Sequence, residues 1–178
     1  MALARLIYKQ SKEVSTRVKA STIISFIKGK QPHFTDNGLT YLTIDTLEGN
    51  GEMTFSDSGV KCTEKDILMV MDGAASGRCY FGHSGYVGST LAKIECNGTD
   101  PSIVYLALEE HENDIQKNTT GSAIPHTDKR YVGELLIPQI SNQKTIFKIS
   151  SLMRSVIALR KGIVKLRQQK SVLMNKYF

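Results

Sequence analysis

The chain has 178 residues and a mass of 19.7 kDa, with 40% hydrophobic and 22% charged residues. This length predicts one compact domain with room for an appended element, and the composition excludes a disordered or collagen-like protein. No apolar run can span a bilayer, and basic residues interrupt the first dozen positions, so we expect neither a membrane protein nor a signal peptide. Three widely spaced cysteines favour free thiols in a cytoplasmic protein over a zinc knuckle or a disulfide framework.

The net charge of +6 is divided unevenly along the chain. Residues 1–30 carry seven basic and one acidic side chain, residues 31–134 seven basic and sixteen acidic, and residues 135–178 nine basic and none acidic. The three parts therefore have net charges of +6, −9 and +9. Two interpretations of the basic ends remain open, namely a polyanion partner and a solvated helix face rich in Lys and Arg.

The first 138 residues predict a mixed α/β globular domain. Gly29 is placed to end a short helix, residues 73–89 are a glycine-rich loop, and residues 121–125 are a second loop. Asp100-Pro101 is a favourable helix start, because Asp caps and Pro at the first position loses no needed hydrogen bond. The expected elements, in chain order, are a helix over 20–27, strands over 39–45, 67–71 and 90–96, a helix over 100–115 and a strand over 134–137.

The C-terminal segment carries the clearest pattern. Apolar residues recur at alternating spacings of three and four, which keeps one stripe of a coiled-coil helix against a partner. Pro138 blocks extension upstream and Ser141 or Asn142 can cap the start, so residues 142–175 predict one helix on the order of 50 Å long at ~1.5 Å per residue. Only Lys170 interrupts the pattern. This stripe, called the seam below, comprises Ile149, Leu152, Val156, Leu159, Ile163, Leu166 and Leu173. We expect residues 1–138 to form the domain and residues 139–178 to serve dimerisation and subunit docking.

Motifs that would mark an enzyme are missing from the sequence. There is no Gly-x-x-x-x-Gly-Lys-Ser/Thr phosphate loop and no His-x-x-x-His pair for zinc. The acidic cluster Glu109, Glu110, Glu112 and Asp114 is typical of a solvated helix face. We therefore expect no catalytic residue, no metal ion and no cofactor, with a small nuclease or transferase kept as a remaining alternative.

Several stretches match a known family in order and spacing. Residues 18–32 and 41–45 are similar to its entry segment and following strand. Lys65-Asp-Ile-Leu68 and Gly73-Ala-Ala-Ser-Gly-Arg78 are similar to a G-D-I-L … G-x-x-G segment, with Lys65 in place of the usual Gly. The most specific part joins Thr120-Gly-Ser-Ala-Ile-Pro125, Leu135-Leu-Ile-Pro138 and Gln143, although Asn142 stands where the family has Glu. The chain thus resembles one half of a type I restriction–modification specificity subunit, with a single target-recognition domain and one long conserved helix.

This resemblance implies a non-catalytic subunit that supplies DNA sequence specificity to methyltransferase (modification) subunits and to a restriction subunit. Family members usually hold two recognition domains, each reading half of a bipartite site, with two antiparallel helices as a spacer. A second copy pairing through the seam would restore that architecture and should read a two-fold related site in double-stranded DNA. Lys and Arg on loops are the usual contacts to phosphates and base edges. We expect DNA contacts from Lys28, Lys30, Gln31, Ser76, Arg78, Lys129 and Arg130.

Other interpretations remain open at this point. For each of those residues, ordinary surface charge is an equally simple explanation. Within the same family, the chain could instead be the specificity partner of a fused restriction–methylation enzyme. A different class is a coiled-coil protein-interaction module whose globular head does not bind DNA, and the net charge of −9 over residues 31–134 favours it.

Overall fold

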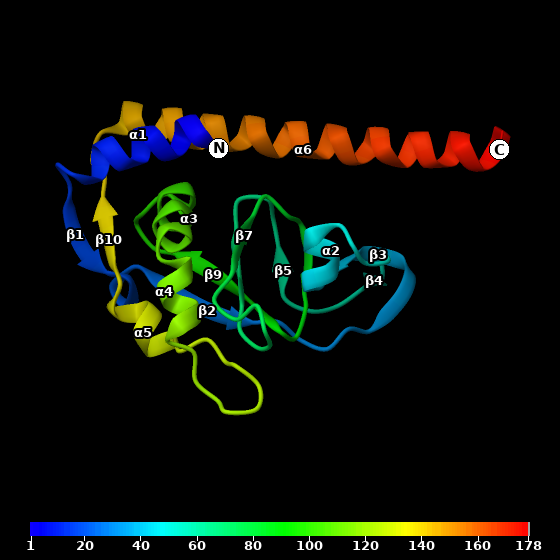
Figure 1. Ribbon diagram of the computed structural model, residues 1–178, viewed down its shortest axis with the longest axis horizontal. Coiled ribbons are helices and arrows are strands. Elements are labelled where there is room, and N and C mark those ends of the chain that lie inside the picture. Colours follow the sequence, from blue (N-terminus) through cyan, green and yellow to red (C-terminus); the bar gives the residue numbers. More distant parts are fainter. Residues whose placement is uncertain (178) are drawn as a thin grey trace.

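A globular head and one long helix make up the structure (Figure 1). This computed structural model describes residues 1–177, apart from the side chains of residues 167, 168, 171 and 175–177. The elements in chain order are α1 (Ala2–Lys12), β1 (Thr16–Lys19), the 3-10 turn η1 (Ala20–Thr22), β2 (Ile24–Lys28), β3 (Phe34–Leu42), α2 (Ile44–Glu48), β4 (Phe55–Ser56), β5 (Lys61–Cys62), β6 (Ile67–Val70), β7 (Cys79–Phe81), β8 (Gly85–Val87), β9 (Leu91–Cys96), α3 (Pro101–Glu110), α4 (Glu112–Lys117), α5 (Lys129–Glu134), β10 (Leu136–Gln139) and α6 (Gln143–Tyr177).

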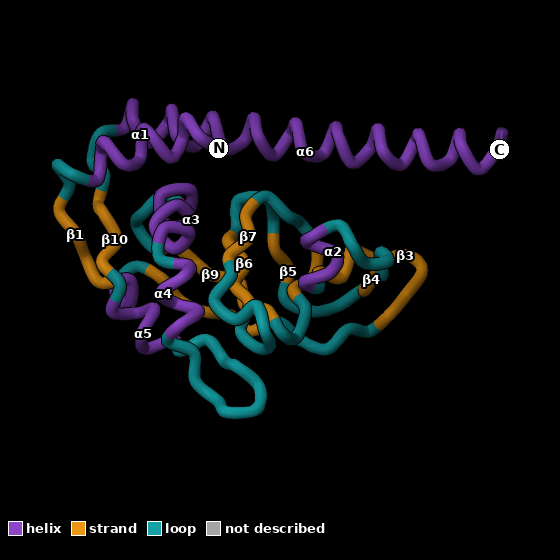
Figure 2. Tube along the Cα trace, viewed as in Figure 1, coloured by secondary structure: helices purple, strands orange, loops and turns teal. Residues whose placement is uncertain are grey.

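Two four-stranded sheets form the head, and a two-stranded ribbon joins it to the helices (Figure 2). The first sheet has the order β2-β9-β6-β7 and is antiparallel, with Ile24 opposite Cys96 and Ile67 opposite Ile94. The second has the order β4-β3-β8-β5 and includes one parallel pair, β3 with β8. All four residues of β6 are buried, as expected for a strand covered on both faces. The ribbon pairs β1 with β10.

Helix α6 runs along one side of the head, with α1 beside its first part in the opposite direction (Figure 1). Ala4 and Tyr8 of α1 are buried in the same core as Ile149 and Met153 of α6. The start of α3 is also tied to α6, because the Ser150 hydroxyl donates to Asp100 Oδ2 at 2.9 Å. The first part of α6 is therefore an integral part of the head's core.

The predicted mixed α/β fold with a long C-terminal helix is confirmed. The strands expected over 67–71 and 90–96 are present as β6 and β9, and the Asp100 carboxylate caps α3 by accepting from Ser102 N at 2.9 Å. The C-terminal helix begins after Asn142, whose Oδ1 accepts from Thr145 N at 3.1 Å. Local sequence signals were sufficient for these elements.

Several expectations about shorter elements differ from the structure. Residues 73–89, expected as a glycine-rich loop, contain β7 and β8, and the helix expected over 100–115 is divided at His111 into α3 and α4. The helix expected over 20–27 is a 3-10 turn followed by β2, because pairing with β9 outweighs local helix preference. The strand expected over 39–45 ends at Leu42, where Thr43 and Thr46 form a capping box that starts α2. The strand expected over 134–137 spans Leu136–Gln139, since Glu134 ends α5.

Candidate nucleic-acid interface

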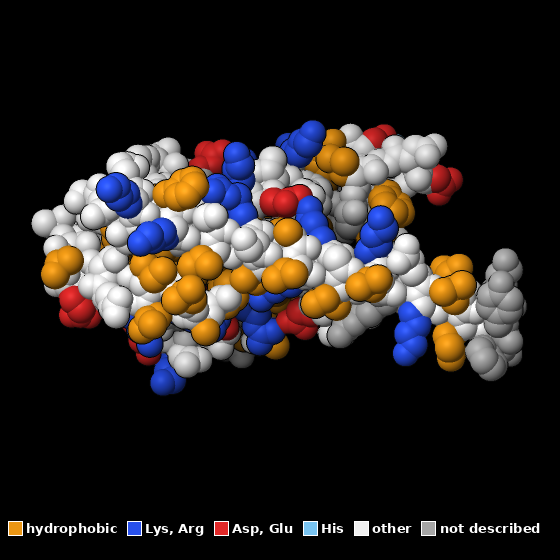
Figure 3. All heavy atoms as spheres, turned by 90° about the horizontal axis from the view of Figure 1, so that it is seen from above, with side chains coloured by type: hydrophobic (Ala, Val, Ile, Leu, Met, Phe, Trp, Pro, Cys, Tyr) orange, Lys and Arg blue, Asp and Glu red, His pale blue; other side chains and the backbone are white. Residues whose placement is uncertain are grey.

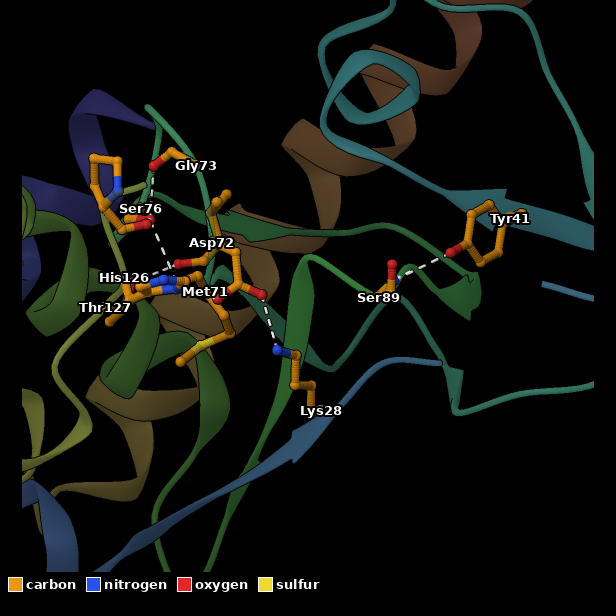
Figure 4. A network of polar contacts seen from close by, with 11 residues as sticks. Lys28, Tyr41, Met71, Asp72, Gly73, Ser76, Ser89, His126 and Thr127 are labelled. Atoms are coloured by element: carbon orange, nitrogen blue, oxygen red, sulfur yellow. Dashed lines mark hydrogen bonds and ion pairs between the residues drawn. The ribbon is translucent and has the colours of Figure 1, made fainter. Parts of the chain in front are cut away.

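Asp72 joins three segments that are distant in the sequence (Figure 4). It follows β6, and its Oδ2 accepts a hydrogen bond from Lys28 Nζ at 2.8 Å, while His126 Nδ1 lies 2.7 Å from its Oδ1. Burial acts to raise the pKa of Asp72, but hydrogen bonds and charge from Lys28 and His126 hold it below its ordinary value. The side chains of Lys28 and His126 are about half exposed, at 54% and 50%. This group, called the Asp72 cluster, therefore fixes two surface cations on one carboxylate when His126 is protonated.

Basic side chains extend from the Asp72 cluster to the start of α5. Lys129 Nζ lies 5.6 Å from the centroid of the Phe26 ring, and Phe26 is two residues from Lys28 on the same face of β2. Asp128 caps α5 by accepting from Arg130 N at 2.8 Å, and the Arg130 side chain is 92% exposed. Lys28, Lys129 and Arg130 thus form a basic rim on one side of the head.

Residues 119–126, called the finger loop, project from the head on the side away from α6 (Figure 1). Thr120 and His126 exchange both backbone hydrogen bonds, at 2.8 and 2.7 Å, across a turn in which Gly121 has a φ of +92°. The tip, residues 121–124, is exposed, and Ile124 is 57% exposed. The loop is therefore closed at its base by one isolated bridge and carries an exposed apolar residue beyond it.

The base of the finger loop is fixed to the strands beneath it (Figure 4). The hydroxyl of Ser76, a residue only 1% exposed, lies 2.9 Å from Pro125 O and 2.7 Å from Gly73 O. Buried Thr127 donates from its hydroxyl to Val70 O at 2.6 Å. Because both anchors are buried hydrogen bonds, the loop leaves the head in a defined direction.

The seven predicted DNA-contact residues lie in different places. Lys28, Lys129 and Arg130 come together in the basic rim, and Lys30 and Gln31 are exposed on the segment that follows β2. Lys28 is about a hundred residues away from Lys129 and Arg130 in the sequence, and the fold brings them to the same side of the head.

The contacts of Ser76 and Arg78 are with parts of the head other than the basic rim. Ser76 is buried under the finger loop, where its hydroxyl faces backbone carbonyls. Arg78 forms an ion pair with Glu48 at 2.5 Å and approaches Glu112 at 3.9 Å, so it bridges α2 and α4. In this structure both residues contact other parts of the head.

Sequence reasoning missed Asp72 and His126. They are separated by 54 positions, and each alone is an ordinary polar residue next to a glycine-rich or proline-containing loop. The one available signal was that His126 directly follows the most specific stretch of the family resemblance, residues 120–125.

One part of the α6 seam is packed against the head, and the other part is exposed. Ile149 is fully buried in the head's core, and Leu152 and Val156 are half-buried. Further along, the seam residues are between 51% and 68% exposed, namely Leu159, Ile163, Leu166 and Leu173. Figure 3 shows hydrophobic side chains in a row along this helix with Lys and Arg beside them.

A groove of about 1000 Å³ separates the middle of α6 from the head. Arg154, Ile157, Ala158 and Lys161 of α6 line it, and Lys161 forms an ion pair with Glu64 of the head. None of these four belongs to the seam, so the exposed part of the seam occupies a different face of α6 from the groove.

Among the described residues, no helix has the length and apolar character needed to cross a membrane. Within the same residues, no group of three or more His, Cys, Asp or Glu side chains is arranged to hold a metal ion.

Comparison with known proteins identifies the kind of protein to which these features belong. No protein-family model matches the chain. The chain is 30% identical over 174 residues to the type I restriction enzyme MjaVIII specificity subunit of Methanocaldococcus jannaschii, covering 90% of this chain and 41% of that protein. The chain corresponds to about half of a type I restriction–modification specificity subunit. The resemblance inferred from the sequence motifs is thereby confirmed.

Solved specificity subunits share the fold. The type I restriction–modification S subunit from M. genitalium has a TM-score of 0.60 at 16% identity, over 88% of this chain and 42% of that one. The HsdS subunit from Thermoanaerobacter tengcongensis has a TM-score of 0.58 at 15% identity, over 98% and 51%. The chain therefore spans between two fifths and one half of the length of these relatives.

Proposed function

We propose that this chain is the DNA-recognition component of a type I restriction–modification system. It has no catalytic role of its own and directs methyltransferase and restriction subunits to a bipartite site in double-stranded DNA, in the cytoplasm. The observation that carries the proposal is the pairing of one recognition-sized head with one long helix whose seam is half exposed. A subunit with two heads would need a second copy of this unit, and the exposed seam is a surface on which that copy can dock.

The basic rim and the finger loop are the surface that we assign to DNA. Lys28, Lys129 and Arg130 are exposed cations that can contact phosphates, with Lys30 and Gln31 beside them on the chain. Ser76 supports this surface indirectly by fixing the finger loop, whereas Arg78 is occupied by Glu48. Phosphate contacts of this kind position a protein on DNA, and base contacts then supply specificity.

The geometry of α6 suits a two-fold dimer. Its exposed seam is centred near residue 166, while its contacts with the head are centred near Met153. An antiparallel pair centred at residue 166 would separate the two heads by roughly 39 Å along the helix axis at ~1.5 Å per residue. That is close to one turn of DNA, ~34–36 Å, so two heads could reach two half-sites on the same side of a duplex.

The proposal is tested by mass and by DNA selection. Light scattering should give a mass near twice 19.7 kDa for the chain alone, and a larger complex when the neighbouring methyltransferase subunit is added. Selection from a random duplex library should then enrich a two-fold related sequence. A strict monomer that neither binds the methyltransferase nor enriches any duplex would overturn the proposal.

A second candidate is a coiled-coil interaction module with a head that does not bind DNA. The net charge of −9 over residues 31–134 favours it, because a negative surface repels a polyanion. A dimer that binds the methyltransferase subunit but enriches no duplex, alone or in complex, would select this candidate over DNA recognition.

A further inference from the structure

An acidic side chain, Asp72, lies beside the basic rim that we assign to DNA. Its carboxylate binds Lys28, a cation of that rim, and the Asp72 side chain is 24% exposed. Charge alone predicts that a carboxylate in this place repels a phosphate backbone and weakens DNA binding. The contacts around Asp72 indicate the opposite effect.

The backbone on both sides of Asp72 is fixed by hydrogen bonds to the segment that follows the finger loop (Figure 4). The Gly73 amide donates to Pro125 O at 2.9 Å, and the Thr127 amide donates to Met71 O at 2.8 Å. The Asp72 side chain therefore leaves the head from a backbone of defined position.

The two carboxylate oxygens of Asp72 have different partners. Oδ1 lies 2.7 Å from His126 Nδ1, and Nδ1 carries the hydrogen of this bond, because an ionised carboxylate can only accept. Oδ2 accepts from Lys28 Nζ at 2.8 Å. That bond uses one of the three hydrogens on Nζ, so two remain for a phosphate. Held by His126 on one side, Asp72 is a fixed support for Lys28 on the other.

The backbone of Lys28 is fixed as well. Lys28 ends β2, which is paired with β9, and the amide of the next residue, Gly29, donates to Leu91 O at 2.9 Å. A Cβ on Gly29 would lie 2.1 Å from Gly88 O, so the two backbones are in close contact. Only the long side chain of Lys28 is left to be ordered, and Asp72 orders it. A lysine restrained in this way loses less rotamer freedom when it binds a phosphate.

We propose that Asp72 is a positioning residue for DNA binding, which holds the Lys28 ammonium group where it contacts a phosphate. Asp72 touches no DNA and acts through Lys28, while His126 keeps the carboxylate in place. The contact made by Lys28 is independent of base sequence. This inference rests on the proposed DNA-recognition function, and it predicts that removing a negative charge from an acidic head weakens its binding to a polyanion.

The two effects of Asp72 on affinity have opposite signs. One screened surface charge changes the affinity for a nearby phosphate by about twofold, so loss of the carboxylate as a charge would strengthen binding by that factor. Loss of the order that it imposes on one long side chain should weaken binding by about fivefold. The net expectation is a loss of about threefold, and the sign of the change tests the proposal.

The test measures binding of the full-length chain to a random-sequence duplex, alone and in complex with the methyltransferase subunit. Asp72→Asn should weaken binding about threefold, and Lys28→Gln should weaken it about tenfold and reduce the slope of log affinity against log salt by about one. Asp57→Asn is the matched control, because Asp57 is an exposed carboxylate 3.0 Å from a histidine, His33, in the other sheet. Asp57→Asn should leave binding unchanged or strengthen it up to about twofold.

A double variant shows whether Asp72 acts through Lys28. In the Lys28→Gln background, Asp72→Asn should weaken binding no further, because the cation that it positions is already gone. A second loss as large as the first would mean that Asp72 affects binding by another route, and would overturn the proposal. Urea unfolding curves at the assay pH establish that each variant is folded when its affinity is measured.

The remaining outcomes separate the inference from the function on which it rests. If Asp72→Asn binds as tightly as the wild type or more tightly, the positioning role is overturned while DNA recognition stands. An unchanged salt slope for Lys28→Gln has the same consequence, since Lys28 then contacts no phosphate. If the wild-type chain binds no duplex, alone or in complex, DNA recognition itself fails and the inference fails with it.

Discussion

Replacing Ile149 with Ala should destabilise the fold, whereas the same replacement at Ile163 should leave the fold intact and weaken self-association. Both residues are isoleucines of the seam, and they lie two heptads apart in α6. Ile149 is fully buried in the core between α6, α1 and the head, while Ile163 is 51% exposed. Comparing the two variants therefore distinguishes the contribution of the seam to the stability of one chain from its contribution to the association of two chains.

The magnitudes follow from burial. Ile149→Ala removes three buried carbons, about 2.4 kcal/mol of transfer free energy at ~0.8 kcal/mol per carbon, and the cavity brings the loss to about 3–4 kcal/mol. Ile163→Ala should cost less than about 0.5 kcal/mol in the monomer, because half of Ile163 is already exposed to solvent and Ala has the higher helix propensity. A two-fold dimer buries the exposed half of both copies, so dimerisation should lose about 2.4 kcal/mol, or about 50-fold in Kd.

Urea denaturation at low protein concentration measures the first quantity, since the monomer then dominates and its unfolding does not depend on concentration. Sedimentation equilibrium measures the second. Equal losses of unfolding free energy for the two variants would refute the division of the seam. So would an Ile163→Ala dimer as tight as the wild type, which would place the dimer contact, if any, on another face.

Two further predictions concern titration. Burial raises the pKa of the Cys62 thiol to about 11 and that of Cys96 to about 12, so native protein at pH 8 should react slowly with Ellman's reagent and urea-unfolded protein fast; fast reaction of all thiols in native protein would contradict this. The folded-state pKa of Asp72 lies below its unfolded value, so Asp72 stabilises the fold above about pH 4 and that contribution is lost as pH falls through the folded pKa. Asp72→Asn should flatten the acid limb of a stability–pH curve, and an unchanged limb would show that other carboxylates control it.

Elements defined by local signals could be predicted from the sequence. The spacing of apolar residues defined α6, and the Asp100-Pro101 pair defined the start of α3, because a periodic stripe and a helix cap are properties of a few neighbouring residues. β2 could not be predicted, because a short apolar run such as residues 23–27 fits a helix and a strand equally well. Only its pairing partner β9, about seventy residues later, decides between them.

The candidate site was predictable only in part for the same reason. Lys28, Lys129 and Arg130 were predicted as loop cations, whereas the structure places them in β2 and α5. Asp72, the carboxylate that binds Lys28, has its two partners 44 and 54 positions away in the sequence. The seam posed a related problem, because an apolar stripe predicts that a helix face is packed but does not identify the packing partner. Around Ile149 the partners are α1 and the head, and the pattern within residues 142–175 carries no information about them.

The basic–acidic–basic charge pattern has an explanation that neither a polyanion partner nor a solvated face provides. Arg5 and Lys12 of α1 form ion pairs with Glu109 and Glu110 of α3, and Lys161 of α6 forms one with Glu64 of the head. The basic ends of the chain thus contact its acidic middle. Exposed ion pairs contribute little to stability, about 0–1 kcal/mol each, so their effect is on the placement of the helices. Part of the head's negative charge is therefore paired with cations of α1 and α6, so the net charge of −9 over residues 31–134 overstates the charge that the head presents to a partner.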